Sequence, residues 1–182
     1  DGQKADMVFT DPPYNMGYTG SATKRRKKID NDKIENFGEF ISNALASMVD
    51  SCKGSASYYM FTCPIEVATI VDAYNSVGIK PSQMLIWRKH RIGFGGNDYQ
   101  RQYEPFIYGW KTHKERYMIN NRTLSDVWDF SRPTKSELHP TMKPIELISY
   151  AVGNSSKIDD IVMDLFLGSG STLIACEKTG RK

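Results

Sequence analysis

The feature that most constrains the fold is an alternation of apolar strands and amphipathic helices in the first half of the chain. The expected order is strand, helix, strand, helix, strand, over residues 7–10, 36–52, 56–61, 64–77 and 83–87. Strands that alternate with helices are joined by right-handed crossovers and run parallel to one another. We therefore predict an α/β fold with a mostly parallel sheet.

The two expected helices carry signals at their ends. Asn36 and Glu39 have the spacing of a capping box, and Gly54 is placed to stop the first helix. The second helix begins at Pro64 and is followed by Gly78. These signals set the predicted boundaries of both helices.

The pattern changes after residue 87. Residues 88–102 are basic and rich in glycine, which predicts a loop, whereas 106–110 reads as a strand. This strand follows the previous one too closely for a crossover helix, so it should be antiparallel to its neighbour. Residues 111–138 are polar and irregular. The remaining expected elements are a helix, a strand and a helix, at 145–152, 161–165 and 173–179.

Size and charge narrow the class of protein. With 182 residues the chain should form a single domain with its own core. The net charge of +3 and the pI near 8.7 are too weakly basic to indicate a nucleic-acid partner by themselves. The three cysteines and three histidines are scattered, so neither a disulfide framework nor a metal site is indicated. Without a signal peptide or an apolar run of about 18 residues, we predict a soluble, cytoplasmic protein.

A candidate catalytic stretch, Asp11-Pro12-Pro13-Tyr14, directly follows the first expected strand. Ligands of open α/β sheets bind beyond the carboxyl ends of the strands, so Asp11 should lie at the mouth of a cleft. The prolines stiffen the backbone and leave its carbonyls without local donors, and Tyr14 offers a flat apolar face. These groups suit a flat ligand that carries an NH2 group. The alternative is a strand that ends in a Pro-Pro turn with an incidental acid.

A second candidate site is the glycine loop from Asp164 to Thr172. The order strand, Gly-x-Gly, helix brings backbone close to a ligand at a helix N-terminus. A phosphate-binding loop would need a lysine that is absent here, and a dinucleotide loop would need a third glycine where Leu173 stands. The remaining interpretations are an adenosyl-cofactor loop, in which an acid ends the strand, and a tight structural turn.

Together the two motifs resemble those of the S-adenosylmethionine-dependent DNA amino-methyltransferases. Asp-Pro-Pro-Tyr comes early, Asp-x-Phe-x-Gly-Ser-Gly-Ser-Thr comes late, and His-Pro-Thr-Met-Lys-Pro stands just before the latter. This order is similar to that of the beta group of the family. Further similar segments are Trp87-Arg88-Lys89, Asp98-Tyr99, Glu104-Pro105 and Tyr108-Gly109. The family often has His-Glu where this chain has Tyr103-Glu104, so no role of that histidine is carried over.

The resemblance implies a Rossmann-like methyltransferase domain over residues 1–182, with S-adenosylmethionine as cofactor and double-stranded DNA as substrate. The implied catalytic residues are Asp11, Pro12, Pro13 and Tyr14. The implied cofactor-binding residues are Asp11, Thr141, Lys143, Pro144, Asp164, Phe166, Gly168, Ser169, Gly170, Ser171 and Thr172, with Thr141, Lys143 and Pro144 near the methionine end. Residues 111–138 fall where the family keeps its target-recognition region. A homodimer and a cognate restriction enzyme are further expected partners.

Two basic segments are candidate DNA contacts. Their cationic residues are Lys24, Arg25, Arg26, Lys27 and Lys28 in the first, and Arg88, Lys89, Arg91 and Arg101 in the second. Taken alone, a basic run is also typical of a solvated loop. In a DNA methyltransferase the first segment would grip phosphate as its loop closes over a flipped base, and the second would line the same face.

The chemistry of the residues fits methyl transfer to an exocyclic amine, whose lone pair is delocalised into the ring. The Asp11 carboxylate and the Pro12 carbonyl can accept its two N–H groups, which aims the lone pair at the methyl group. The base must leave the duplex, and Tyr14 would stack on it. A cytosine-C5 enzyme would need Pro-Cys, and only the reverse order, Cys63-Pro64, occurs. By resemblance Asp11 favours adenine N6, with cytosine N4 methylation and a non-catalytic DNA-binding remnant as alternatives.

The distance between the glycine loop and Lys182 adds a further expectation. In related folds an acid about 20 residues past the glycines binds the ribose hydroxyls, and the chain stops before that point. We therefore expect the last strands to be missing, residues 161–165 to form an exposed apolar edge, and the isolated chain to bind its cofactor weakly.

Overall fold

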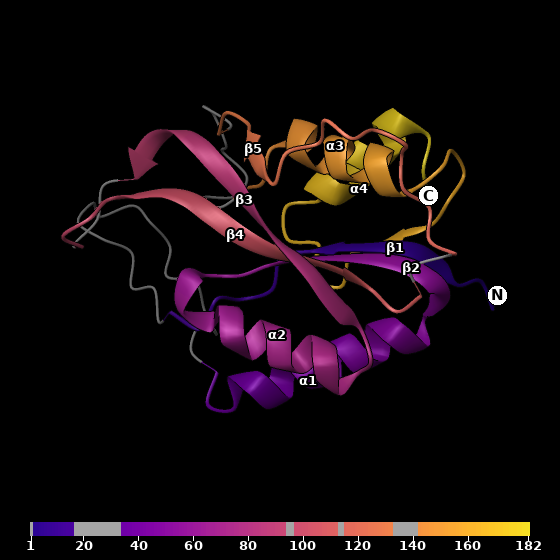
Figure 1. Ribbon diagram of the computed structural model, residues 1–182, viewed down its shortest axis with the longest axis horizontal. Coiled ribbons are helices and arrows are strands. Elements are labelled where there is room, and N and C mark those ends of the chain that lie inside the picture. The colour runs from indigo at the N-terminus through magenta and orange to yellow at the C-terminus, as the bar shows by residue number, and fades with distance from the viewer. Residues whose placement is uncertain (1, 17–33, 94–96, 113–114, 133–141) are drawn as a thin grey trace.

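The computed structural model describes residues 2–16, 34–93, 97–112, 115–132 and 142–182. A twisted sheet forms the middle layer, and helices cover both of its faces (Figure 1). One face carries α1 (Phe37–Asp50), the short 3-10 helix η1 (Pro64–Glu66) and α2 (Val67–Ser76). The other face carries α3 (Ile145–Ser155) and α4 (Ser171–Thr179). None of the helices within the described ranges has the length and hydropathy needed to cross a membrane.

The sheet has the strand order β5-β3-β4-β2-β1-β6 within the described residues. The strands are β1 (Ala5–Thr10), β2 (Cys52–Phe61), β3 (Lys80–Gly93), β4 (Arg101–Trp110), β5 (Val127–Asp129) and β6 (Val162–Met163). β4 is antiparallel to both β3 and β2, whereas the pairs β5–β3, β2–β1 and β1–β6 are parallel. The predicted mostly parallel sheet with one antiparallel strand is therefore confirmed for the described strands.

The helix boundaries agree with the sequence to within about three residues, the largest difference being α3, which ends at Ser155 where we predicted Val152. The Asn36 amide donates to the Glu39 carboxylate at 2.8 Å, so these two side chains pair with each other instead of capping the backbone. α1 ends at Asp50, and Gly54 lies inside β2 instead of stopping the helix. The reason is that β2 begins immediately after Ser51, whose N–H closes the last turn of α1. Gly78 follows α2 with a φ of +74°, as expected for a helix stop.

Each face of the sheet has its own apolar core. Val8 of β1 packs with Ile41 of α1 on one face. The next residue, Phe9, packs on the other face with Phe61 of β2 and Ala151 of α3. Alternate residues of a strand point to opposite faces, and each large buried side chain contributes about 1.5–3 kcal/mol. β1 is thus held from both sides, which fixes the position of the residues that follow it.

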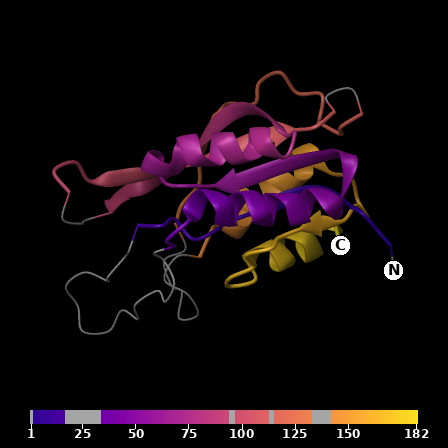
Figure 2. The ribbon, with the colours of Figure 1, turned by 90° about the horizontal axis from the view of Figure 1, so that it is seen from below.

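The segment predicted as a basic glycine-rich loop is largely a hairpin. β3 continues to Gly93, β4 begins at Arg101, and the paired ends project beyond the helices (Figure 2). Trp87 and Lys89 are buried while Arg88 between them is exposed, which is the alternation of a strand. The loop prediction was wrong for this part because the inward positions of the strand include a charged residue, so the apolar alternation is interrupted.

The irregular segment 111–138 contains a strand that the sequence did not indicate. β5 has three residues and pairs in parallel with β3, opposite Ile86, Trp87 and Arg88. Trp128 of β5 is buried, with ring centroids 5.0 Å from Phe106 and 4.8 Å from Tyr150. Three residues are too few to show a periodicity, so aromatic packing and not local pattern positions this strand.

β6 lies at the edge of the described sheet, where we expected a bare apolar strand. The Lys182 N–H donates to the Asp160 carbonyl at 2.9 Å, and the Val162 N–H donates to the Lys182 carbonyl at 2.8 Å. These two bonds have the pattern of a parallel ladder. The edge expected to be bare is thus paired with Lys182 around Ile161, whereas the rest of residues 161–165 stays partly exposed, with Leu165 49% exposed.

Candidate active site

The two candidate motifs meet at the carboxyl ends of β1 and β6. β1 and β6 are parallel neighbours, so the residues that follow them emerge at the same edge of the sheet. Asp11 directly follows β1, and Asp164 directly follows β6. The Thr10 hydroxyl donates to Asp164 Oδ1 at 2.7 Å. A direct hydrogen bond therefore joins two segments that are far apart in sequence.

Asp164 braces the glycine loop. Besides Thr10, its carboxylate accepts the Thr172 hydroxyl at 2.6 Å and the Phe166 N–H at 3.1 Å. Burial raises the pKa of Asp164, and these hydrogen bonds act in the opposite direction. The carboxylate thus ties the end of β1 and the first turn of α4 to the loop between them.

The loop itself is open where the sequence predicts a ligand. Gly168 and Gly170 have φ values of +53° and +77°, which favour glycine. A Cβ added at Gly170 would meet no atom within 4 Å, and at Gly168 the nearest atom would be the Phe166 carbonyl oxygen at 3.7 Å. Ser169 and Ser171 share a hydrogen bond of 2.9 Å at the start of α4. The loop therefore exposes backbone at a helix N-terminus, as the cofactor interpretation requires.

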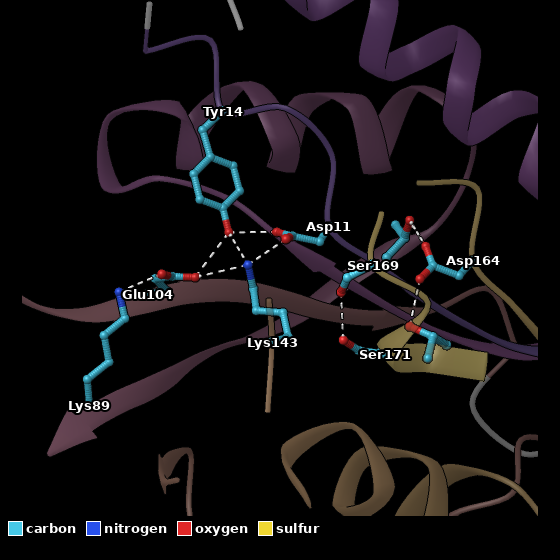
Figure 3. A network of polar contacts seen from close by, with 10 residues as sticks. Asp11, Tyr14, Lys89, Glu104, Lys143, Asp164, Ser169 and Ser171 are labelled. Carbon is cyan, nitrogen blue, oxygen red and sulfur yellow. Dashed lines mark hydrogen bonds and ion pairs between the residues drawn. The ribbon is translucent and has the colours of Figure 1, made fainter. Parts of the chain in front are cut away.

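A network of charged and polar groups surrounds Asp11 (Figure 3). The Lys143 ammonium lies 2.5 Å from Asp11 Oδ2 and 3.1 Å from Glu104 Oε2. The Tyr14 hydroxyl donates to Asp11 Oδ1 at 2.7 Å and lies 3.2 Å from Glu104 Oε2. Lys89 pairs with the other oxygen of Glu104 at 2.5 Å. Two carboxylates, two ammonium groups and one hydroxyl thus form a connected cluster.

Burial and pairing set the ionisation of this cluster. Burial by itself lowers the pKa of Lys143, but the Asp11 and Glu104 carboxylates outweigh it and raise the pKa. Burial likewise opposes ionisation of Glu104, but Lys143 and Lys89 lower its pKa to about 2. Burial, and then the carboxylates of Asp11 and Glu104, raise the pKa of Tyr14 well above 10, so its hydroxyl stays protonated. Burial lowers the pKa of Lys89, although Glu104 opposes this.

The fold explains how these residues come together. Glu104 of β4 lies opposite Trp87 of β3, and Lys89 is two residues further along the same face. Lys143 directly precedes Pro144, at the start of α3. Asp11 and Tyr14 come from the end of β1. The cluster therefore collects charges from three separate parts of the chain.

The structure brings some of the predicted site residues together, and others lie outside the described residues. It brings Asp11, Tyr14 and Lys143 together, and the predicted role of Lys143 at the methionine end of the cofactor stays a prediction. Pro12 is buried, and no described residue donates a hydrogen bond to its carbonyl. Pro13 precedes Tyr14 in the chain, and Pro144 follows Lys143. Thr141 and the basic run 24–28 lie outside the described residues.

The predicted DNA contacts on the hairpin fall into exposed arginines and one buried lysine. Arg91 and Arg101 are exposed, and an Arg101 guanidinium nitrogen lies 3.0 Å from the Met16 sulfur. Arg88 is exposed but forms a two-bond pair with Asp129 at 2.5 and 2.6 Å. Lys89 is 6% exposed and bound to Glu104, so it belongs to the buried cluster and not to the outer surface.

Sequence reasoning missed Glu104 and Lys89 as members of the site. The signal that could have found them is a pair of charged residues flanked by large apolar ones, Trp87 before Lys89 and Phe106 after Glu104. Charged side chains at inward positions of adjacent strands are rarely buried unless they are paired.

Comparison with known proteins decides the family. The family model described as DNA methylase matches residues 5–182. The chain belongs to this DNA methylase family. The match confirms the resemblance to S-adenosylmethionine-dependent DNA amino-methyltransferases that the two motifs indicated.

Curated relatives align with nearly the whole of this DNA methylase. Type II methyltransferase M2.LlaDCHI of Lactococcus lactis subsp. cremoris is 27% identical over 206 residues, covering 99% of this chain and 76% of the relative. Type II methyltransferase M1.MboII of Moraxella bovis is 24% identical over 225 residues, covering 98% of this chain and 82% of the relative.

Solved structures confirm the fold of the DNA methylase. M1.HpyAVI in complex with SAM, S-adenosylmethionine, superposes with a TM-score of 0.73 at 22% identity, covering 99% of this chain and 81% of that one. The cytosine-N4-specific PvuII DNA methyltransferase superposes with a TM-score of 0.74 at 16% identity, covering 99% and 73%. The predicted Rossmann-like methyltransferase fold is therefore correct.

Proposed function

We propose that this DNA methylase transfers a methyl group from S-adenosylmethionine to adenine N6 of a base flipped out of double-stranded DNA. The observation that carries the proposal is the direct link between the two motifs: Thr10, next to Asp11, is hydrogen-bonded to Asp164 of the glycine loop. This link holds the Asp11 segment and the glycine loop at one edge of the sheet, which supports the proposed roles of acceptor and cofactor loop.

The residues of the glycine loop fit the expected cofactor. The open space at Gly170 allows a ligand to approach the backbone, and the N-terminus of α4 presents N–H groups there. Phe166, Ser169 and Ser171 line the same segment, and Asp164 and Thr172 hold it in shape. When bound, S-adenosylmethionine supplies a methyl group on a sulfonium, which is a good leaving group.

Asp11 and Pro12 are the proposed acceptors for the target amine. No described residue donates a hydrogen bond to the Pro12 carbonyl, which we propose accepts one N–H group of the amine. The Asp11 carboxylate accepts the other, which holds the nitrogen with its lone pair directed at the methyl group. Pro13 keeps this backbone stiff, and the ring of Tyr14 stacks on the base. Catalysis then rests on positioning and fixed charges, not on a strong base.

Cytosine N4 is the second candidate target. One of the solved structures with this fold is a cytosine-N4-specific enzyme, so the fold is compatible with either base. The preference for adenine rests on Asp11, since cytosine enzymes resembling this chain more often carry Ser at that position. The Asp11 carboxylate at the end of β1 is the residue on which this choice depends.

DNA contacts are proposed for the face that carries the hairpin. Arg91 and Arg101 are exposed cations on β3 and β4, and the basic run 24–28 is a further candidate. The segment 111–138 is proposed as the target-recognition region. A homodimer and a cognate restriction enzyme stay predictions.

Incubation of the purified protein with methyl-labelled S-adenosylmethionine and duplex DNA tests the proposed activity. Label in the DNA that depends on both protein and cofactor is the expected result. Cofactor-independent DNA binding without label would favour the non-catalytic remnant.

A further inference from the structure

Two hydrogen-bond donors in the site are each shared between the same two carboxylates. The Lys143 ammonium lies 2.5 Å from Asp11 and 3.1 Å from Glu104. The Tyr14 hydroxyl lies 2.7 Å from Asp11 and 3.2 Å from Glu104. In both cases the shorter contact goes to Asp11, and a second acceptor stands next to it (Figure 3).

This arrangement matters because Asp11 must bind the target amine under the proposed function, on which the inference rests. Lys143 occupies Oδ2 of Asp11 and Tyr14 occupies Oδ1. A carboxylate has about four acceptor positions, but donors already in place compete for them with an incoming N–H group. Asp11 is better able to hold the amine if its present donors have another acceptor within reach.

We propose that Glu104 is a positioning residue, the alternative acceptor toward which Lys143 and Tyr14 shift when Asp11 takes up the target amine. Neither group loses its proton in this exchange. The ammonium and the hydroxyl remain donors, and only the carboxylate that receives them changes.

Glu104 is well placed for this role. Its other oxygen is anchored by Lys89 at 2.5 Å, and its position on β4 is fixed opposite Trp87 of β3. The oxygen that faces Lys143 and Tyr14 is the same one, Oε2. Lys143 is 6% exposed, so water is a poor substitute acceptor for its charge.

A static ion pair is the competing interpretation, in which Glu104 serves only to neutralise the buried ammonium of Lys89. The two interpretations differ in which residue links Glu104 to methyl transfer, Lys143 or Lys89. In the proposed role the effect of Glu104 on methyl transfer depends on Lys143. In a purely structural role it depends on the buried charge of Lys89 and is the same whether or not Lys143 is present.

The test is a double-mutant cycle with Glu104→Gln and Lys143→Met, read as the methyl-transfer rate at saturating S-adenosylmethionine and DNA. Glu104→Gln should lower this rate about 10- to 100-fold, the range expected for loss of a hydrogen bond to a charged group. In the Lys143→Met background the same change should lower the rate by a clearly smaller factor, because Tyr14 is then the only one of the two shared donors that remains. The cofactor affinity of Glu104→Gln, measured by calorimetry, should match that of the unaltered protein.

Asp6→Asn is the matched control. Asp6 pairs with Lys53 at 2.6 Å at the opposite end of β1, and its side chain has the same exposure as that of Glu104, 18%. This variant should methylate DNA like the unaltered protein. Thermal unfolding checks that each variant folds, and Glu104→Asp, which withdraws the carboxylate but keeps its charge, completes the same cycle if Glu104→Gln does not fold.

The possible results distinguish a failure of the proposed role of Glu104 from a failure of the proposed methyl transfer. Equal losses in both backgrounds, or no loss in Glu104→Gln, would overturn the role of Glu104 while methyl transfer by the unaltered protein still supports the proposed function. Absence of methyl transfer by the unaltered protein would overturn both.

Discussion

The Thr10 hydroxyl and the Asp164 carboxylate share a hydrogen bond of 2.7 Å between the ends of two parallel strands. Thr10 stands immediately before the proposed acceptor of the target amine, and Asp164 begins the proposed cofactor loop. The separation of the two reacting groups therefore depends on how firmly these strand ends are joined. Small errors in such a separation are costly to a reaction that relies on positioning.

Loss of the Thr172 hydroxyl should loosen the glycine loop. Thr172 donates to Asp164 Oδ2 at 2.6 Å, and Thr172→Val removes that bond while keeping the shape of the side chain. We expect affinity for S-adenosylmethionine to fall about tenfold, because a net hydrogen bond contributes about 1 kcal/mol and the half-buried Asp164 carboxylate loses a donor. Calorimetry measures this directly.

Thr179→Val in the same helix is the control for that experiment. The Thr179 hydroxyl bonds to the Ala175 carbonyl within α4, away from the loop. The affinity of the Thr179→Val variant for the cofactor should match that of the unaltered protein. Equal losses in both variants would show that α4 stability, and not the bond to Asp164, controls binding.

The two exposed arginines of β3 should differ in their contribution to DNA binding. Arg91→Ala should weaken binding and reduce the log-log salt slope by at most about 0.9 for each lost phosphate contact. Arg88→Ala should change the slope less, because Asp129 already neutralises Arg88 through two hydrogen bonds. Salt titrations of DNA binding measure both slopes. A larger change for Arg88 than for Arg91 would contradict this assignment.

Acid should remove the stabilising contribution of Glu104. Its pKa is about 2 in the folded protein against an ordinary value of 4.5, so the carboxylate stabilises the fold above pH 4.5 and this contribution fades as the pH falls toward 2. The stability difference between the unaltered protein and Glu104→Gln should shrink by about 3 kcal/mol across that window. Urea unfolding at a series of pH values measures the difference, and a constant difference would contradict the ion-pair account.

The sequence could predict the parts of the site that directly follow strands. Asp11 and the glycine loop each come immediately after a short apolar run, and a parallel sheet brings such ends to one edge. The same local signals placed α1, α2 and α3 within a few residues of their observed bounds.

The contacts between these segments could not be predicted in the same way. Glu104, Lys89 and Lys143 belong to different segments, and nothing in their spacing says that one ammonium reaches two carboxylates. β5 was not predicted for a related reason. Its position depends on the packing of Trp128 against aromatic rings that are far away in sequence, and not on a local pattern.

Asp11→Ala should abolish methyl transfer and leave the fold intact. Asp11 is 26% exposed, and Lys143 retains Glu104 as a partner when Asp11 is removed. The loss should appear mainly in kcat, by about 100-fold or more, since the contact counts most in the transition state. Steady-state kinetics measure kcat, with thermal unfolding as the control. Near-normal turnover would show that another group holds the amine.

The identity of the methylated base tests the central claim most directly. DNA methylated by the purified protein is hydrolysed to nucleosides, which are separated and measured by mass spectrometry. Aspartate at position 11, where the similar cytosine enzymes more often carry Ser, predicts N6-methyladenine as the main product. N4-methylcytosine as the main product would contradict it.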